Sequence, residues 1–182
     1  MPLRILIWFV VLTSVSTLGE TSMPKTVHQD GFFVVGIEVR TTNAKEMNGE
    51  GVIPKQWRKF FQDGIQQKIP DKVDGTIYAV YTDYASDRNG EYSFVIGVKV
   101  NPNATVPAGM ALRKIPAGDY AVLTSDKGPV SKVVPAAWQQ IWSLEDKHQL
   151  GGPRAYRADF EVYDQRAADP QSSQVDVYVG VK

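Results

Sequence analysis

Val-Ile-Pro-Lys-Gln-Trp at residues 52–57 and Val-Val-Pro-Ala-Ala-Trp at residues 133–138 are two copies of one helix start. In both copies a proline stands in the first turn, where its missing N–H leaves no helical hydrogen bond unmade. A tryptophan follows three residues later, and further apolar residues continue on its face. The two copies therefore predict helices over residues 53–64 and 134–142.

Two further blocks repeat in the same order. Tyr-Ala-Val-Tyr at 78–81 matches Phe-Glu-Val-Tyr at 160–163, and Val-Ile-Gly-Val-Lys at 95–99 matches Tyr-Val-Gly-Val-Lys at 178–182. Each block is rich in β-branched and aromatic residues, which favours strands. Strands are expected over residues 32–40, 76–83, 92–100, 110–115, 119–124, 157–163 and 175–181.

An internal repeat of this length predicts the architecture directly. We expect an α+β fold of tandem pseudo-symmetric βαββ repeats, at about residues 31–101 and 108–182. Each repeat has one main helix, the sheets are antiparallel, and a cleft lies between the repeats. Because half a chain buries too little surface to fold well alone, the repeats should pack as one domain, residues 31–182.

The N-terminus has the pattern of a secretory signal peptide. Arg4 precedes an apolar run over residues 5–12, and small residues follow up to Gly19. The run is shorter than the roughly 20 residues that span a bilayer. We expect residues 1–19 to be a signal peptide, residues 20–30 to be a linker, and the protein to be exported, periplasmic or secreted. No stable membrane insertion is expected after cleavage.

Composition excludes several classes of function. Lys+Arg and Asp+Glu each number 20, so the net charge is zero and no nucleic acid is expected as a partner. The absence of Cys excludes a lipoprotein anchor, a thiol nucleophile and disulfides. His28 and His148 are far apart, so neither a metal site nor haem or another cofactor is expected. Asp83, Asp87 and Glu91 are interpreted as turn residues around Asn-Gly rather than as a calcium loop.

Strand alternation separates two faces and singles out one carboxylate. The valines at 175, 177, 179 and 181 form one face, expected to pack on the helices together with Phe160 and Val162. The other face would carry Glu161 and Tyr163, with Tyr178 and Tyr81 nearby. Aromatic rings around a carboxylate suit a cationic ligand. Glu161 stands where the first repeat has Ala79, so it is not required by the repeat itself. An exposed glutamate on a solvated sheet face is the alternative.

Several segments together resemble the GyrI-like, AraC-type effector-binding domains. They are Val34–Thr42, Ile115–Val122, Trp138–Trp142, Phe160–Asp164 and Val175–Lys182. The resemblance implies two βαββ units with a cleft for a small organic molecule, often cationic and aromatic. It also implies that Glu161 is the central acidic residue, and that Tyr178, Trp138 and Trp142 supply aromatic contacts. The segment before the first strand leaves no room for a helix-turn-helix.

The leading hypothesis is therefore a small-molecule binding module without a DNA-binding domain. Its expected ligand-binding residues are Glu161, Tyr178, Tyr163, Tyr81, Trp138 and Trp142. A hydrolase that uses Glu161 as acid and base beside Tyr163 or Tyr178 stays open, although no catalytic nucleophile is predicted. A protein-interaction or inhibitor module is the third possibility.

Overall fold

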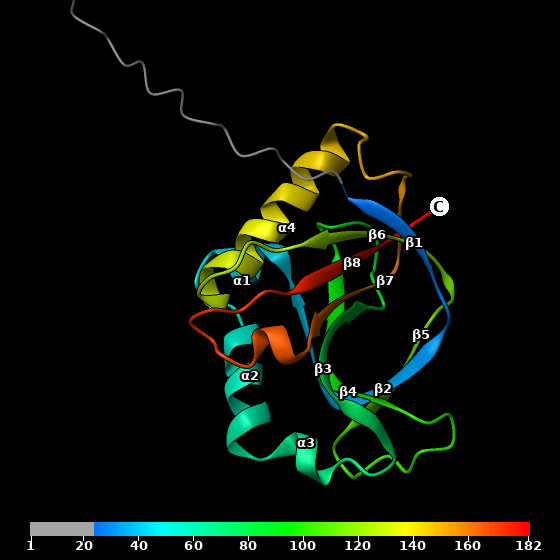
Figure 1. Ribbon diagram of the computed structural model, residues 1–182, viewed down its shortest axis with the longest axis vertical. Helices are drawn as coiled ribbons and strands as arrows, with labels where there is room; N and C mark the ends of the chain where they lie inside the picture. Colours follow the sequence, from blue (N-terminus) through cyan, green and yellow to red (C-terminus); the bar gives the residue numbers. More distant parts are fainter. Residues whose placement is uncertain (1–23) are drawn as a thin grey trace, which may run out of the picture.

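The computed structural model describes residues 24–182, which form one curled antiparallel sheet with helices on one side (Figure 1). The predicted signal peptide lies outside these residues. The α+β class and the antiparallel pairing are as the sequence predicts. The eight strands are β1 (Lys25–Gln29), β2 (Phe32–Thr42), β3 (Lys72–Thr82), β4 (Glu91–Val100), β5 (Ala111–Ile115), β6 (Gly118–Thr124), β7 (Arg154–Tyr163) and β8 (Asp176–Val181).

Two long helices correspond to the two repeated helix starts. Pro54 lies in the first turn of α2, as expected. The second helix, α4, begins about a turn earlier than predicted, so Pro135 lies inside it and removes one helical hydrogen bond. A short helix, α1, directly follows β2. The helices are α1 (Asn43–Met47), α2 (Ile53–Gln62), α3 (Ile65–Lys68), α4 (Val130–Asp146) and the 3-10 turn η1 (Gln165–Ala167). None of the helices within residues 24–182 is long and apolar enough to cross a membrane.

The strand order displays the internal duplication. The sheet runs β1-β6-β8-β7-β3-β4-β2-β5, and its central six strands are symmetric about the β3–β7 pair. Strands β2, β3 and β4 of the first repeat therefore correspond to β6, β7 and β8 of the second. The pseudo-two-fold axis passes close to the paired residues Ala79 and Glu161.

The first strand of each half pairs with the outer strand of the other half. Strand β1 pairs with β6, and β5 pairs with β2. The two ladders share one register, because Gln29 faces Gly118 and Phe32 faces Ile115. Two long bent arms, β1–β2 and β5–β6, thus run past each other. The expected linker at 20–30 is wrong for residues 25–29, which form β1, so the repeated unit is ββαββ rather than βαββ.

Both faces of the sheet are apolar. One face packs under the helices, and the other is buried inside the curl of the sheet. Phe32, Val80 and Phe160 belong to a cluster inside the curl, away from the helices. Two other clusters lie under the helices, one centred on Phe60 of α2 and one on Ile141 of α4. An apolar strand face therefore does not have to face a helix in this protein.

A pair of glycines lies where the sheet is most closely packed. Gly36 of β2 faces Gly97 of β4. A Cβ atom on Gly36 would lie 2.0 Å from the carbonyl oxygen of Ile96, and one on Gly97 would lie 2.1 Å from that of Val35. Only glycine permits the two backbones to approach so closely.

Candidate ligand site: a buried carboxylate in an aromatic cage

Glu161 lies at the centre of the molecule with three donors around its carboxylate. Its side chain is on the sheet face that the helices cover, and the residue is 1% exposed. Trp138 Nε1 donates to Oε1 at 2.6 Å, and Tyr81 Oη donates to the same oxygen at 2.7 Å. Tyr163 Oη donates to Oε2 at 2.6 Å. The carboxylate is therefore fixed by side chains from α4, β3 and β7.

The cage follows the pseudo-symmetry of the fold, apart from its acid. Tyr81 packs edge-on to Trp138 with ring centroids 4.9 Å apart, and Tyr163 packs edge-on to Trp57 at 4.8 Å. These are equivalent pairs from the two halves. Glu161 is the residue that breaks the symmetry, because its register partner on β3 is Ala79.

Glu161 has no cationic partner among the described residues, since all three of its donors are uncharged. Burial raises the pKa of the Glu161 carboxyl above its ordinary value, although the three hydrogen bonds act in the opposite direction. Burial, reinforced by the charge of Glu161, also raises the pKa of Tyr81 and of Tyr163 well above 10. Both phenols therefore remain neutral donors, and the site lacks a positive charge that would balance the carboxylate.

Four of the predicted site residues lie together in the cage, namely Glu161, Tyr81, Tyr163 and Trp138. The ring centroid of Trp142 lies 6.3 Å from that of Trp138. The expected face was wrong, because Glu161 and Tyr163 point toward the helices. Tyr178 was also placed wrongly. It stands opposite Phe160 rather than Glu161, and its ring stacks on Phe160 inside the curl at 4.6 Å.

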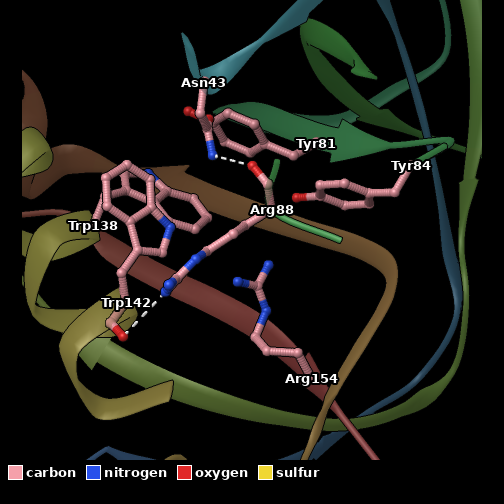
Figure 2. A pocket seen from close by; sticks show the side chains of 7 residues that line it. All are labelled: Asn43, Tyr81, Tyr84, Arg88, Trp138, Trp142 and Arg154. Atoms are coloured by element: carbon pink, nitrogen blue, oxygen red, sulfur yellow. Dashed lines mark hydrogen bonds between the residues drawn. The ribbon is translucent and has the colours of Figure 1, made fainter. Parts of the chain in front are cut away.

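A small cavity adjoins Tyr81 and Trp138, between the two repeats, where a ligand-sized cleft was expected (Figure 2). Its volume is about 20 Å³, room for about one water molecule. Arg88, from the loop between β3 and β4, closes one side. It donates to the Trp142 carbonyl at 3.4 Å and to Asp146 Oδ1 at 2.8 Å, and Asn43 Nδ2 donates to the Arg88 carbonyl at 2.8 Å.

A second carboxylate, Asp159, lies two residues before Glu161 on the same face of β7 and is fully buried. Unlike Glu161, it is paired with a cation, because Arg154 Nη2 donates to its Oδ2. Tyr84 Oη donates to that oxygen at 2.6 Å, and the Gly180 N–H donates to Oδ1 at 2.9 Å. The two carboxylates of β7 thus differ in their charge balance, although their positions in the sequence pattern are alike.

Sequence reasoning missed Asp159, Arg154, Tyr84 and Trp57. The sequence contained a signal for two of these residues, Trp57 and Asp159. Trp57 is the repeat counterpart of Trp138, and Asp159 shares the alternation of Glu161. The place of Arg154 depends on a bulge in β7 and on the positive φ of Tyr156, which no sequence pattern indicates.

The uncompensated charge of Glu161 should reduce stability at neutral pH. The pKa of Glu161 is higher in the folded protein than in the unfolded chain. Below the unfolded-state pKa the carboxyl is protonated in both states, and the protein keeps its full stability. That stability is lost as the pH rises through the folded-state pKa, because the folded protein then has to bury a charge. We expect Glu161→Gln to raise the free energy of unfolding by about 1 kcal/mol at pH 8. Urea unfolding at pH 8 and near pH 4 measures this. A gain of equal size at both values would contradict the charge explanation.

Neither histidine takes part in the site. His28 Nδ1 lies 2.9 Å from Asp119 Oδ1 on the surface. Within residues 24–182, no group of three or more His, Asp or Glu side chains could hold a metal ion.

A duplicated domain that presents one buried carboxylate in an aromatic cage is an effector-binding domain of the GyrI-like class. The model of a family described as integron-associated effector binding protein matches residues 25–181. The chain belongs to this family.

Two curated relatives are described as regulators. The chain is 35% identical over 156 residues to the putative transcriptional regulator YobU of Bacillus subtilis, covering 85% of this chain and 95% of YobU. It is 32% identical over 157 residues to the transcriptional regulator BrlR of Pseudomonas aeruginosa, covering 85% of this chain. The match spans only 54% of BrlR.

Two solved structures share the fold. An integron cassette protein from the mobile metagenome of Vibrio cholerae has a TM-score of 0.67 and 25% identity, over 88% of this chain and 96% of that one. SAV2435, solved with bound tetraphenylphosphonium, has a TM-score of 0.71 and 19% identity, over 88% of this chain and 94% of that one.

Proposed function

We propose that this protein binds a small organic cation with aromatic character and that Glu161 supplies the counter-charge. The observation that carries the proposal is the buried carboxylate, which has three neutral donors and no cation. An unbalanced buried charge is costly unless a partner arrives. A cationic ligand is such a partner, and the fold keeps the carboxylate ready for it.

The aromatic cage suits the same class of ligand. Tyr81, Tyr163 and Trp138 present ring faces and edges around the acid, and cations are attracted to the faces of such rings. The hydroxyl hydrogens of the two tyrosines can rotate, so their hydrogen bonds can be redirected while their rings stay packed. The relative SAV2435, which has the same fold, was solved with tetraphenylphosphonium, a cation of this kind.

Access requires movement, because the cavity beside Tyr81 holds no more than one small molecule such as water. We take the loop that carries Arg88 as the part that moves. Arg88 pairs with Asp146, whose side chain is 61% exposed, and lies 3.6 Å from the less exposed Glu145. An exposed ion pair contributes only about 0–1 kcal/mol. Displacement of the loop that carries Arg88 would open the Trp138 side of the cage.

Glu161→Gln tests the proposal, because glutamine has the same shape and no charge. We expect tetraphenylphosphonium to bind the variant about 10- to 100-fold more weakly than the wild type, the range for losing a hydrogen-bonded or charged partner. Quenching of tryptophan fluorescence and isothermal titration calorimetry both measure it.

Glu91→Gln provides the matched control, since Glu91 lies outside the cage and pairs with Arg40 on the surface. Its affinity for tetraphenylphosphonium should equal that of the wild type. Equal affinity in the wild type and in Glu161→Gln would remove Glu161 from the site and overturn the proposal.

A further inference from the structure

The small cavity beside Tyr81 has a larger counterpart on the other side of the pseudo-symmetry axis. Trp138 and Trp142 line the small cavity, and the residues equivalent to them in the repeat are Trp57 and Phe61. Trp57 and Phe61 line a groove of about 830 Å³ between α2 and the segment around η1. Tyr163, the counterpart of Tyr81, forms its inner wall. The duplication has thus produced two equivalent aromatic pockets, one small and one large.

The groove exposes aromatic surface that a folded protein usually covers. Phe61 is 63% exposed, although it is a large apolar residue. Its ring stacks on Trp57 with the planes 20° apart and the centroids separated by 5.8 Å. Trp57 in turn contacts Tyr163. A flat ring could continue this stack without any rearrangement of the core.

The polar residues of the groove favour a positive charge. Asp74 and Asp164 line it, against a single cation, Arg166. Arg166 is already engaged, because its guanidinium pairs with Asp164 at 2.8 Å and with Asp176 at 2.6 Å. Asp74 accepts the Thr76 N–H and is not part of any of the ion pairs of the described residues. The groove therefore carries a net negative charge.

The two pockets differ in how their loops are held. Beside the small cavity, Arg88 reaches across to the end of α4. The arginine in the equivalent loop of the second half, Arg166, turns back to its own strand region instead, toward Asp164 and Asp176. Among the described residues, no ion pair joins the β7–β8 segment to α2, so the groove stays open.

We propose that this groove is a second binding site, which takes a planar aromatic cation by stacking on Phe61 and Trp57 beside Asp74. The site takes its ligand class from the proposed function, but it needs neither the Glu161 carboxylate nor the opening of the cage. Its volume lies within the range of pockets that hold drug-sized ligands.

The test uses 9-aminoacridine, a planar cation, and acridine, a planar ring that is neutral at pH 8. Binding is followed by the polarisation of dye fluorescence, and stoichiometry is measured by equilibrium dialysis. The wild type should bind two equivalents of 9-aminoacridine, and Glu161→Gln should retain one. In the Glu161→Gln background, Phe61→Ser should weaken the remaining binding about tenfold, and Asp74→Asn should weaken it severalfold. Acridine should bind this site more weakly than 9-aminoacridine does.

Met47→Ser is the matched control, because Met47 is equally apolar, 70% exposed and outside the groove. Since Phe61 is on the surface, its replacement should leave the fold intact, and circular dichroism would verify this. The groove proposal is overturned if Phe61→Ser affects binding no more than Met47→Ser. It is also overturned if Glu161→Gln abolishes all binding, a result that would leave the function of Glu161 intact. If Glu161→Gln retains both equivalents, the groove stands and the proposed role of Glu161 fails.

Discussion

Asp159→Asn is expected to lower the free energy of unfolding by about 3–5 kcal/mol, the range for breaking a buried ion pair by removing one partner. Asparagine preserves the shape of the side chain, so no cavity forms. The loss of charge leaves the guanidinium of Arg154 buried, with Glu145 at 3.3 Å as its one remaining acidic partner among the described residues. The hydrogen bonds from Tyr84 and Gly180 lose a charged acceptor as well. Urea unfolding followed by tryptophan fluorescence measures the change.

Asp164→Asn is the comparison for this variant. Asp164 also pairs with an arginine, Arg166, but that ion pair is on the surface and should contribute about 0–1 kcal/mol. The double variant Arg154→Met/Asp159→Leu should recover much of the lost stability, because it removes both charges together. A loss below about 1 kcal/mol in Asp159→Asn would show that the pair is not a major support of the fold.

Gly36→Ala is expected to destabilise the protein by about 3 kcal/mol or more, as overpacking in a rigid core does. The added methyl group would lie 2.0 Å from the Ile96 carbonyl oxygen and 2.6 Å from the Gly97 Cα. Both are backbone atoms, so no side chain can move aside to relieve the contact. Strands β2 and β4 would have to separate where Gly36 faces Gly97. Thermal and urea unfolding, compared with the wild type, give the size of the effect.

Gly75→Ala distinguishes this contact from a general effect of replacing glycine. A Cβ at Gly75 would meet only Gln66 Nε2, at 4.0 Å. Its replacement should therefore change the stability by less than about 0.5 kcal/mol. A similar loss in both variants would mean that the close approach at Gly36 is not the cause.

Most of the fold could be predicted because the duplication is visible in the residues themselves. The repeated Pro and Trp positions located α2 and α4, and β-branched segments located the strands from β2 onward. Strand β1 was missed because Lys25–Gln29 is mostly polar and reaches its partner, β6, only through the crossing of the arms. Short polar strands at an edge carry little periodic signal.

Sequence reasoning named four of the residues that form the buried cage, but it placed them on the wrong face. Glu161 was identified by its contrast with Ala79, and the register confirms that these residues face each other. Its face was wrong because the prediction assumed one apolar face per strand, whereas the curled sheet buries both. The prediction that Tyr178 lies beside Glu161 was wrong for a related reason. The register of the strands decides which side chains are neighbours, and it pairs Tyr178 with Phe160.

The exchange of first strands makes the chain a tethered dimer in physical terms. Each half completes its outer edge with a strand from the other, which is the arrangement that domain swapping produces between separate molecules. Here the segment at residues 101–110 joins the two partners, so their association is intramolecular and independent of protein concentration. Only a fused pair can hold one acid on its two-fold axis, because an assembly of two identical chains would have to place two like charges there or none.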